Sequence, residues 1–220
     1  MAIATFWKED QLPILKEAEA VKARKTFEIP LLVCITGQTE TEIERRFQTQ
    51  NDAWILEYQQ VPVAFGWVAR SAAPIGELGQ HVTVPEGQVY LWNFRTLPAW
   101  RGKGFYPLLL QAIMRQEIAG GTEKLWILTA PENIPSFKGV QKAGFSLVGE
   151  LAYNEQNSVV LVPEEESDRV DAAAHFLNMP QVHTAVKPCW CCNSRHMRKA
   201  KGQCDCSCNT AHHKACNCVH

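Results

Sequence analysis

The cysteines of this 220-residue chain are concentrated at one end, which divides the sequence into two parts with different folding requirements. Eight of the nine lie between residues 187 and 220, at positions 189, 191, 192, 204, 206, 208, 216 and 218. That segment has few large apolar side chains, so burial alone cannot offset the entropy of ordering it. We therefore expect the first 186 residues to hold the globular fold, and residues 187–220 to need another source of stability.

The charge changes at the same place. Residues 187–220 carry a net charge of +5, the rest of the chain carries −6, and together they give the formal net charge of −1. With 46% hydrophobic and 20% charged residues, the composition excludes a disordered chain. No apolar run approaches the roughly 18 residues that a membrane helix needs. Charged residues interrupt the first twenty positions where a secretory signal would be apolar, so a cytoplasmic protein is expected.

The first part of the chain alternates predicted helices and strands, which favours an α+β fold with a mixed sheet and helices on both faces. Apolar periodicity, prolines and glycines place helices at 9–25, 39–49, 102–120, 134–143 and 163–178, and strands at 53–58, 63–70, 89–97, 124–130, 145–153 and 158–162. Cys34, in the apolar run IPLLVCI, is expected to be a packed core thiol. The predicted division is a domain at 1–162, a helix and linker at 163–186, and a tail at 187–220.

A basic turn rich in glycine follows the strand predicted at 89–97, in the sequence TLPAWRGKGFY (96–106). Gly102 and Gly104 allow backbone N–H groups to approach an anion closely. The helix that begins after them directs its positive dipole end to the same place, and Arg101 and Lys103 add charge. This pattern predicts a phosphate-binding turn, although a solvated surface loop has the same composition.

A second motif, APENIPSFKGVQKAGF (130–145), follows about thirty residues later. Together the two motifs resemble the GCN5-related N-acetyltransferase (GNAT) family, with Arg101-x-x-Gly104-x-Tyr106 followed by Asn133 and Ser136 and then Lys142, Gly144 and Phe145. The resemblance extends over about residues 53–162. It implies a mixed, mostly antiparallel sheet flanked by helices, acetyl-CoA as cosubstrate, and acetyl transfer to the amine of a small molecule or peptide.

The resemblance also implies which residues hold coenzyme A. The strand residues Phe94, Arg95 and Thr96 would pair with the pantetheine arm, and Asn133 would bond the pantetheine or its thioester end. The pyrophosphate would lie on the basic turn, formed by Arg101, Gly102, Lys103, Gly104, Phe105 and Tyr106. Asn133 has an alternative role as the N-cap of the following helix, because asparagine is among the best capping residues.

Three departures from the family pattern affect the catalytic assignment. Tyr106 replaces a small residue, Val140 stands where many members have a tyrosine that protonates the leaving thiolate, and strand 124–130 contains no acid. A base is still needed, because an ammonium ion cannot attack a thioester. The candidates are Glu57, Glu77, His81, Glu86 and Tyr90. We select Glu86 as the base and Tyr153 as the acid, with ordinary surface or strand positions as the alternative.

The tail combines thiols and imidazoles at spacings that suit metal ions, including the C-x-x-C pair of Cys189 and Cys192. The twelve possible ligands are Cys189, Cys191, Cys192, His196, Cys204, Cys206, Cys208, His212, His213, Cys216, Cys218 and His220. One zinc ion uses four ligands, so two or more ions account for the tail better than one. The last thirty residues look like bacterial metallothionein sequences. A disulfide scaffold, a small zinc module that binds nucleic acid, and a peptide substrate for modifying enzymes are alternatives, of which nucleic-acid binding is not favoured.

The sequence therefore predicts an acetyl-CoA-dependent N-acyltransferase with a metal-binding tail, for which zinc is the expected ion. The alternative is a non-catalytic protein that binds acyl-CoA and buffers or senses metal through its tail. The acceptor amine and the oligomeric state stay open.

Overall fold

The computed structural model describes residues 1–16, 19–130 and 133–183. Its strands are β1 (Ala2–Trp7), β2 (Val21–Thr26), β3 (Asn51–Tyr58), β4 (Val61–Ala69), β5 (Ala72–Ile75), β6 (Gln80–Thr83), β7 (Gln88–Thr96), β8 (Lys124–Thr129), β9 (Ser146–Tyr153) and β10 (Val159–Pro163). The helices are α1 (Ile29–Thr36), α2 (Glu40–Gln48), α3 (Phe105–Ala119), α4 (Ile134–Ala143) and α5 (Asp168–Leu177), and a short 3₁₀ turn spans Pro98–Trp100. None of the helices in these ranges is long and apolar enough to cross a membrane.

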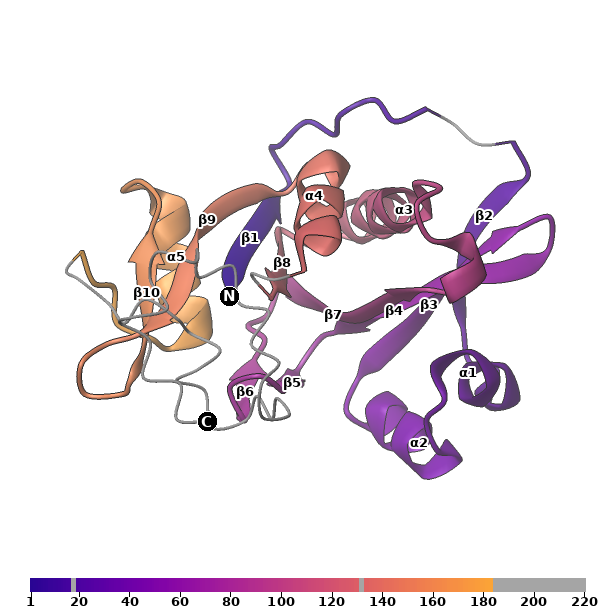
Figure 1. Ribbon diagram of the computed structural model, residues 1–220, viewed down its shortest axis with the longest axis horizontal. Coiled ribbons are helices and arrows are strands. Elements are labelled where there is room, and N and C mark those ends of the chain that lie inside the picture. The colour runs from indigo at the N-terminus through magenta and orange to yellow at the C-terminus, as the bar shows by residue number, and fades with distance from the viewer. Residues whose placement is uncertain (17–18, 131–132, 184–220) are drawn as a thin grey trace, which may run out of the picture.

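Eight of the strands form one sheet in the order β10-β9-β1-β8-β7-β4-β3-β2 (Figure 1). Neighbouring strands run antiparallel except β7 and β8, which are parallel. The sheet is therefore mixed and mostly antiparallel, with helices on its faces, as the sequence predicts. Strands β5 and β6 form a separate hairpin.

Each face of the large sheet has its own hydrophobic core. Helices α3 and α4 cover one face, where Leu109, Ile113 and Val140 are at most 1% exposed. The other face is covered by α1, α2, α5 and the β5–β6 hairpin, with fully buried Leu32 and Ile43 among the packed residues. The site described below therefore lies in a sheet that is supported on both sides.

Helix α5 packs directly on this second face. The Phe176 ring stacks on Trp126 with a centroid distance of 4.9 Å, and it contacts Tyr90 at 6.0 Å. A helix is thus present within the predicted range 163–178 and contributes to the core, but it spans only Asp168–Leu177. The predicted start is wrong, because Pro163 is the last residue of β10. The proposed division of the chain stays a prediction, because the tail at 187–220 lies outside the described residues.

The helix predicted at 9–25 is wrong. Residues 8–16 and 19–20 form no helix, and Val21–Thr26 pairs as an outer strand with β3. Pro13 has no N–H to donate within a helix, and its carbonyl instead accepts a hydrogen bond from Gln111 Nε2 at 2.8 Å. Strand pairing and this contact outweigh the helix propensity of the segment.

The expectation for Cys34 is also wrong, because its side chain is exposed. The run IPLLVCI forms α1, a helix that was not predicted, and it is Leu32 rather than Cys34 that the helix buries. The β1 strand and the β5–β6 hairpin were not predicted. Agreement with the predicted elements within a few residues is found for the β3–β4 and β9–β10 hairpins, for α2, α3 and α4, and for the strand at 124–130.

Candidate functional site

Strands β7 and β8 separate partway along their length. They pair from Gln88 with Lys124 to Leu91 with Ile127, and among the described residues β7 continues to Thr96 without pairing to β8. On its other edge, β7 has one residue more than β4, because Asn93 and Phe94 lie opposite Gly66. This bulge has Asn93 in the left-handed region, at φ 52°. Bulges bend the strand that contains them, so this one accounts for the separation of β7 from β8.

The predicted phosphate-binding turn follows immediately. Gly102 and Gly104 have φ of 76° and 81°, and no heavy atom lies within 4 Å of a Cβ built on either residue. Helix α3 begins at Phe105 with no acidic side chain in its first turn. Lys103 Nζ lies 4.5 Å from the centre of the Trp100 ring. The turn is therefore open and basic, and it adjoins a helix N-terminus whose positive dipole end has no acidic side chain in the first turn.

The second motif forms the start of α4. Asn133 Oδ1 accepts a hydrogen bond from the Ser136 backbone N–H at 3.2 Å, so Asn133 is the N-cap of α4. This is the alternative role that the sequence left open, and the expected contact of Asn133 with coenzyme A stays a prediction. Helices α3 and α4 thus begin on the same side of the opening between β7 and β8, as their positions after these two strands require.

Tyr106 points from α3 to α4. A Cβ at Gly139 would lie 2.5 Å from Tyr106 Cδ1, so the missing side chain at Gly139 makes room for the ring. Ser136 Oγ donates a hydrogen bond to the Tyr106 hydroxyl oxygen at 3.4 Å. Burial raises the pKa of Tyr106 to about 12, although the Ser136 hydrogen bond opposes the change. The large residue at position 106 is therefore accommodated between the helices.

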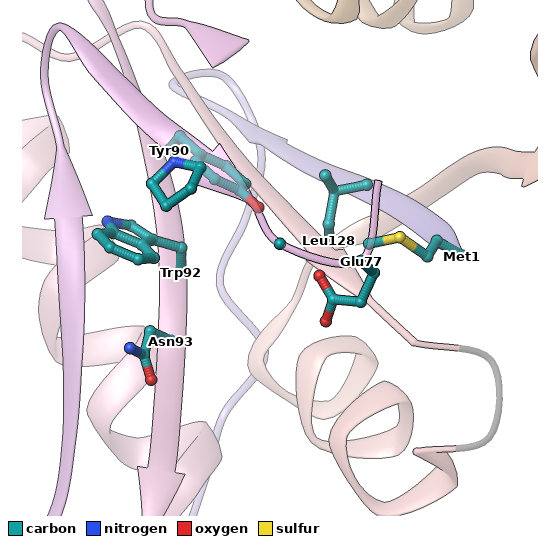
Figure 2. Close-up of a pocket in the computed structure, with 8 residues that line it drawn as sticks. Met1, Glu77, Tyr90, Trp92, Asn93 and Leu128 are labelled. Atoms are coloured by element: carbon teal, nitrogen blue, oxygen red, sulfur yellow. The ribbon is translucent and has the colours of Figure 1, made fainter. Parts of the chain in front are cut away.

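A pocket of about 400 Å³ lies at the same opening, with the β5–β6 hairpin on one side of it (Figure 2). It is lined by Met1, Pro74, Gly76, Glu77, Tyr90, Trp92, Asn93 and Leu128. Figure 2 shows Tyr90, Trp92 and Asn93 along β7, with Met1 and Leu128 across from them and the Glu77 carboxylate directed toward the space between. Tyr90 and Trp92 pack with the core on the face opposite α3 and α4. The opening therefore has a phosphate-type turn on one face and a pocket on the other.

Residues 23–145 match the sequence profile of the Acetyltransferase (GNAT) family, which is more than half of the chain. The chain belongs to this family. The match begins at β2 and ends before β9, so it contains β7, the basic turn and the start of α4.

Three solved acetyltransferase structures are similar to this chain at low sequence identity. A GCN5-related N-acetyltransferase from Kribbella flavida is 16% identical, with a TM-score of 0.48, over 66% of this chain and 53% of its own. The ribosomal-protein-S18-alanine N-acetyltransferase from Escherichia coli is 15% identical, with a TM-score of 0.46, over 61% and 81%. An acetyltransferase from Bacillus subtilis in complex with CoA is 13% identical, with a TM-score of 0.45, over 61% and 81%. This chain thus spans about half the length of the Kribbella protein, and no curated protein matches it significantly.

Within this GNAT fold, the electrostatics of the pocket centre on Glu77 and Tyr90. Burial raises the pKa of Tyr90 far above its usual range, and the nearby negative charge of Glu77 raises it further. The raised pKa favours the protonated form of the Tyr90 hydroxyl, which is suited to donating a hydrogen bond. Whether Tyr90 acts as a base stays a prediction. Glu77 is half-buried on the connection between β5 and β6.

The two selected catalytic residues do not line this pocket. Glu86 is exposed in the turn before β7, at the opposite end of that strand from Thr96, and Tyr153 is buried at the end of β9. Of the strand residues expected to meet the pantetheine, Arg95 is exposed, and Phe94 and Thr96 are half-buried. Sequence reasoning missed Met1, Trp92 and Leu128 as pocket residues. No local signal could have found them, because only the pairing of distant strands brings them together.

The twelve predicted metal ligands lie outside the described residues. Within residues 1–16, 19–130 and 133–183, no three His, Cys, Asp or Glu side chains are grouped as a metal site would require. The metal prediction therefore concerns the tail alone.

Proposed function

We propose that this GNAT protein is an acetyl-CoA-dependent N-acetyltransferase whose acceptor amine binds in the pocket beside Glu77. The observation that carries the proposal is the separation of β7 from β8 between the open basic turn on one face and the pocket on the other. A cosubstrate on the turn could reach an amine in the pocket through this opening. The family membership supports acetyl transfer to an amine, and the acceptor is part of the proposal.

The residues of the turn fit coenzyme A. The open space beside Gly102 and Gly104 leaves their backbone accessible to a pyrophosphate, and Arg101 and Lys103 supply positive charge. The edge of β7 from Phe94 to Thr96 is not paired with β8, so its backbone groups are available to the amides of the pantetheine arm. When bound there, acetyl-CoA supplies an acetyl thioester, whose C–S bond breaks as the C–N bond to the amine forms.

Glu77 is the base in this proposal. An ammonium substrate must lose a proton before its nitrogen can attack, and the half-buried Glu77 carboxylate lies in the pocket to accept it. In this proposal the Tyr90 hydroxyl, which stays protonated, would donate a hydrogen bond to a polar group of the bound amine. Glu86 and Tyr153 stay candidate residues, with a role that only kinetics can assign.

The experiment compares the Glu77→Gln and Glu155→Gln variants. Both lose one carboxylate, but Glu155 is exposed in the turn between β9 and β10. With a panel of primary amines, we expect Glu77→Gln to lower kcat by about 10²-fold or more and Glu155→Gln to leave it unchanged. Calorimetry should give both variants the wild-type affinity for coenzyme A. An unchanged kcat in Glu77→Gln would exclude this residue as the base.

We further propose that residues 187–220 bind two or more zinc ions through the twelve ligands named above. The support is the sequence: eight thiolates set against a fixed charge of +5 leave a negative excess that divalent ions can offset. Mass spectrometry of the intact protein without acid would count the bound metal and any retained coenzyme A. At most one metal ion per chain would exclude the multinuclear proposal. Retained coenzyme A without turnover of any amine would favour the non-catalytic alternative.

A further inference from the structure

A buried arginine reaches the bulge of β7 from helix α2. The Arg46 side chain is 5% exposed and lies between two indole rings, 4.5 Å from the centre of Trp92 and 4.9 Å from that of Trp67. Trp67 lies on β4 and Trp92 on β7, directly before the extra residue of the bulge. The guanidinium is therefore held where β4 and β7 lose their regular register.

The same guanidinium bonds the side chain of the bulge residue itself. Of the two orientations of the Asn93 amide, the one with its oxygen toward α2 is assigned because it satisfies the hydrogen-bonding groups on both sides. In that orientation the oxygen accepts hydrogen bonds from Arg46 Nη1 at 3.0 Å and from Nη2 at 3.2 Å. On the other side, Arg46 Nε donates to Glu42 Oε1 at 2.8 Å. The guanidinium thus links α2 to the residue that has the positive φ angle.

The backbone of α2 is tied to the same place through Asn51. Asn51 Oδ1 accepts a hydrogen bond from Trp92 Nε1 at 2.9 Å, and Asn51 Nδ2 donates to the Arg46 carbonyl at 3.2 Å. Trp92 and Asn93 are therefore both attached to the end of α2. These two residues line the pocket, and they directly follow Leu91, where pairing with β8 ends.

Packing alone does not account for an arginine at this position. Burial penalises the charged form and lowers the pKa of Arg46, while the ion pair with Glu42 opposes the change. Replacing a buried ion pair by apolar side chains of similar volume is often neutral or stabilising. A methionine could fill the space between the two indoles, but it could not bond Asn93. The feature specific to arginine here is the pair of hydrogen bonds to the bulge.

We propose that Arg46 is a positioning residue that fixes the Asn93 bulge and, through it, the opening between β7 and β8 at which cosubstrate and amine meet. The effects on kcat and KM that we expect of Arg46 rest on the proposed function. Arg46 is not among the residues that line the pocket, so it acts through Asn93 rather than on a substrate. Loss of the link should leave the fold intact and loosen the strand segment from Trp92 to Thr96.

The test uses single changes at both ends of the link. Arg46→Met and Asn93→Gly each remove the hydrogen bonds, and glycine tolerates the positive φ angle at position 93. Asn93→Asp keeps an acceptor for Arg46 and is the conservative variant for the exchange measurement alone, because Asn93 also lines the amine pocket and a new carboxylate there changes amine binding. Arg45→Met is the matched control, because Arg45 also pairs with Glu42 but is exposed on the same helix.

Three measurements are made on the full chain: coenzyme A affinity by calorimetry, amide hydrogen exchange of residues 92–96, and kcat and KM for a primary amine. We expect Arg46→Met and Asn93→Gly to lower kcat/KM by about 10- to 100-fold, as small displacements of reacting groups do. Coenzyme A affinity should fall and exchange of residues 92–96 should rise in both variants. Arg45→Met should resemble the wild type in all three measurements, and Asn93→Asp should resemble it in the exchange of residues 92–96. The Arg46→Met/Asn93→Gly double variant should be no worse than either single one.

Several outcomes overturn the inference. Wild-type coenzyme A affinity and wild-type exchange in a folded Asn93→Gly protein would show that the link does not position the bulge. Effects of the two single changes that multiply in the double variant would show the same, because the two residues would then act independently. If Arg46→Met does not fold, the exchange of residues 92–96 in Asn93→Gly, compared with that in Asn93→Asp, decides whether the link positions the bulge. A wild-type protein without turnover would refute the proposed function, whereas the affinity and exchange measurements would still test Arg46.

Discussion

Replacing Gly139 by alanine tests how the fold accommodates Tyr106. Gly139 lies inside α4, where helix propensity alone predicts that alanine stabilises the protein by about 1 kcal/mol. The structure predicts the opposite sign, because the new Cβ would lie 2.5 Å from Tyr106 Cδ1 and 2.9 Å from Cε1. Carbon atoms in contact are normally about 3.5–4.0 Å apart, so the ring would have to move by roughly 1 Å.

The ring cannot move without losing other contacts. Tyr106 packs against Phe94 at 5.9 Å between centroids and is hydrogen-bonded to Ser136. Overpacking of this kind typically costs about 1–3 kcal/mol, which exceeds the gain in helix propensity. We therefore expect Gly139→Ala to lower the free energy of unfolding by roughly 1 kcal/mol. In a Tyr106→Ala background the clash is absent, and Gly139→Ala should raise the free energy of unfolding by about 1 kcal/mol.

Urea denaturation of four proteins measures this coupling: the wild type, the two single variants and the double variant. The expected interaction energy between positions 106 and 139 is about 2 kcal/mol, within the range found for residues in contact. A Gly139→Ala protein more stable than the wild type would refute the reasoning. An equal effect of the change in both backgrounds would refute it as well, because the ring would then not be what Gly139 accommodates.

Three further predictions concern the turn, the acid and the tail. Gly104→Val should weaken coenzyme A binding by at least ~2 kcal/mol, or roughly 30-fold in Kd, through lost charge-assisted hydrogen bonds; an unchanged calorimetric affinity would exclude the turn as the binding site. Tyr153→Phe should lower kcat by about 10²-fold if Tyr153 is the acid, and an unchanged kcat would exclude it. A chelator or acid should remove metal from the tail, because thiolates and imidazoles take up protons. The thermal transition of the sheet domain should persist, because that domain has its own core, and its loss on chelation would contradict the proposed independence of the two parts.

The parts of the fold that the sequence predicts are those with local signals. The central hairpin of β3 and β4, helix α3 and helix α4 each have an apolar period and a nearby turn or cap that a short window contains. The glycines of the basic turn are also local, and their positive φ angles agree with the expected open backbone. The family motif then indicates what such a turn binds.

The parts that were missed depend on long-range contacts. The run VYLWNFRTL looks like one continuous strand, and nothing in it indicates that Asn93 is the extra residue of a bulge. That conformation depends on the register with β4 and on contacts from α2. Glu77 is among the candidate bases, but its place in the pocket was equally hidden, because Pro74 in β5 and Gly76 and Gly79 in the β5–β6 connection suggest a loop.

The place of β1 in the middle of the sheet has a consequence for how the protein folds during synthesis. Its neighbours are β8 and β9, and the Met1 amino group bonds the Leu151 carbonyl, 150 positions away. At the usual rate of about 5–20 residues per second, β1 waits roughly 6–30 s for these partners. During that time its hydrogen-bonding edges are exposed to other chains. Met1 is thus made well before the strands that enclose it, and the pocket that Met1 lines can form only after these strands have been synthesised.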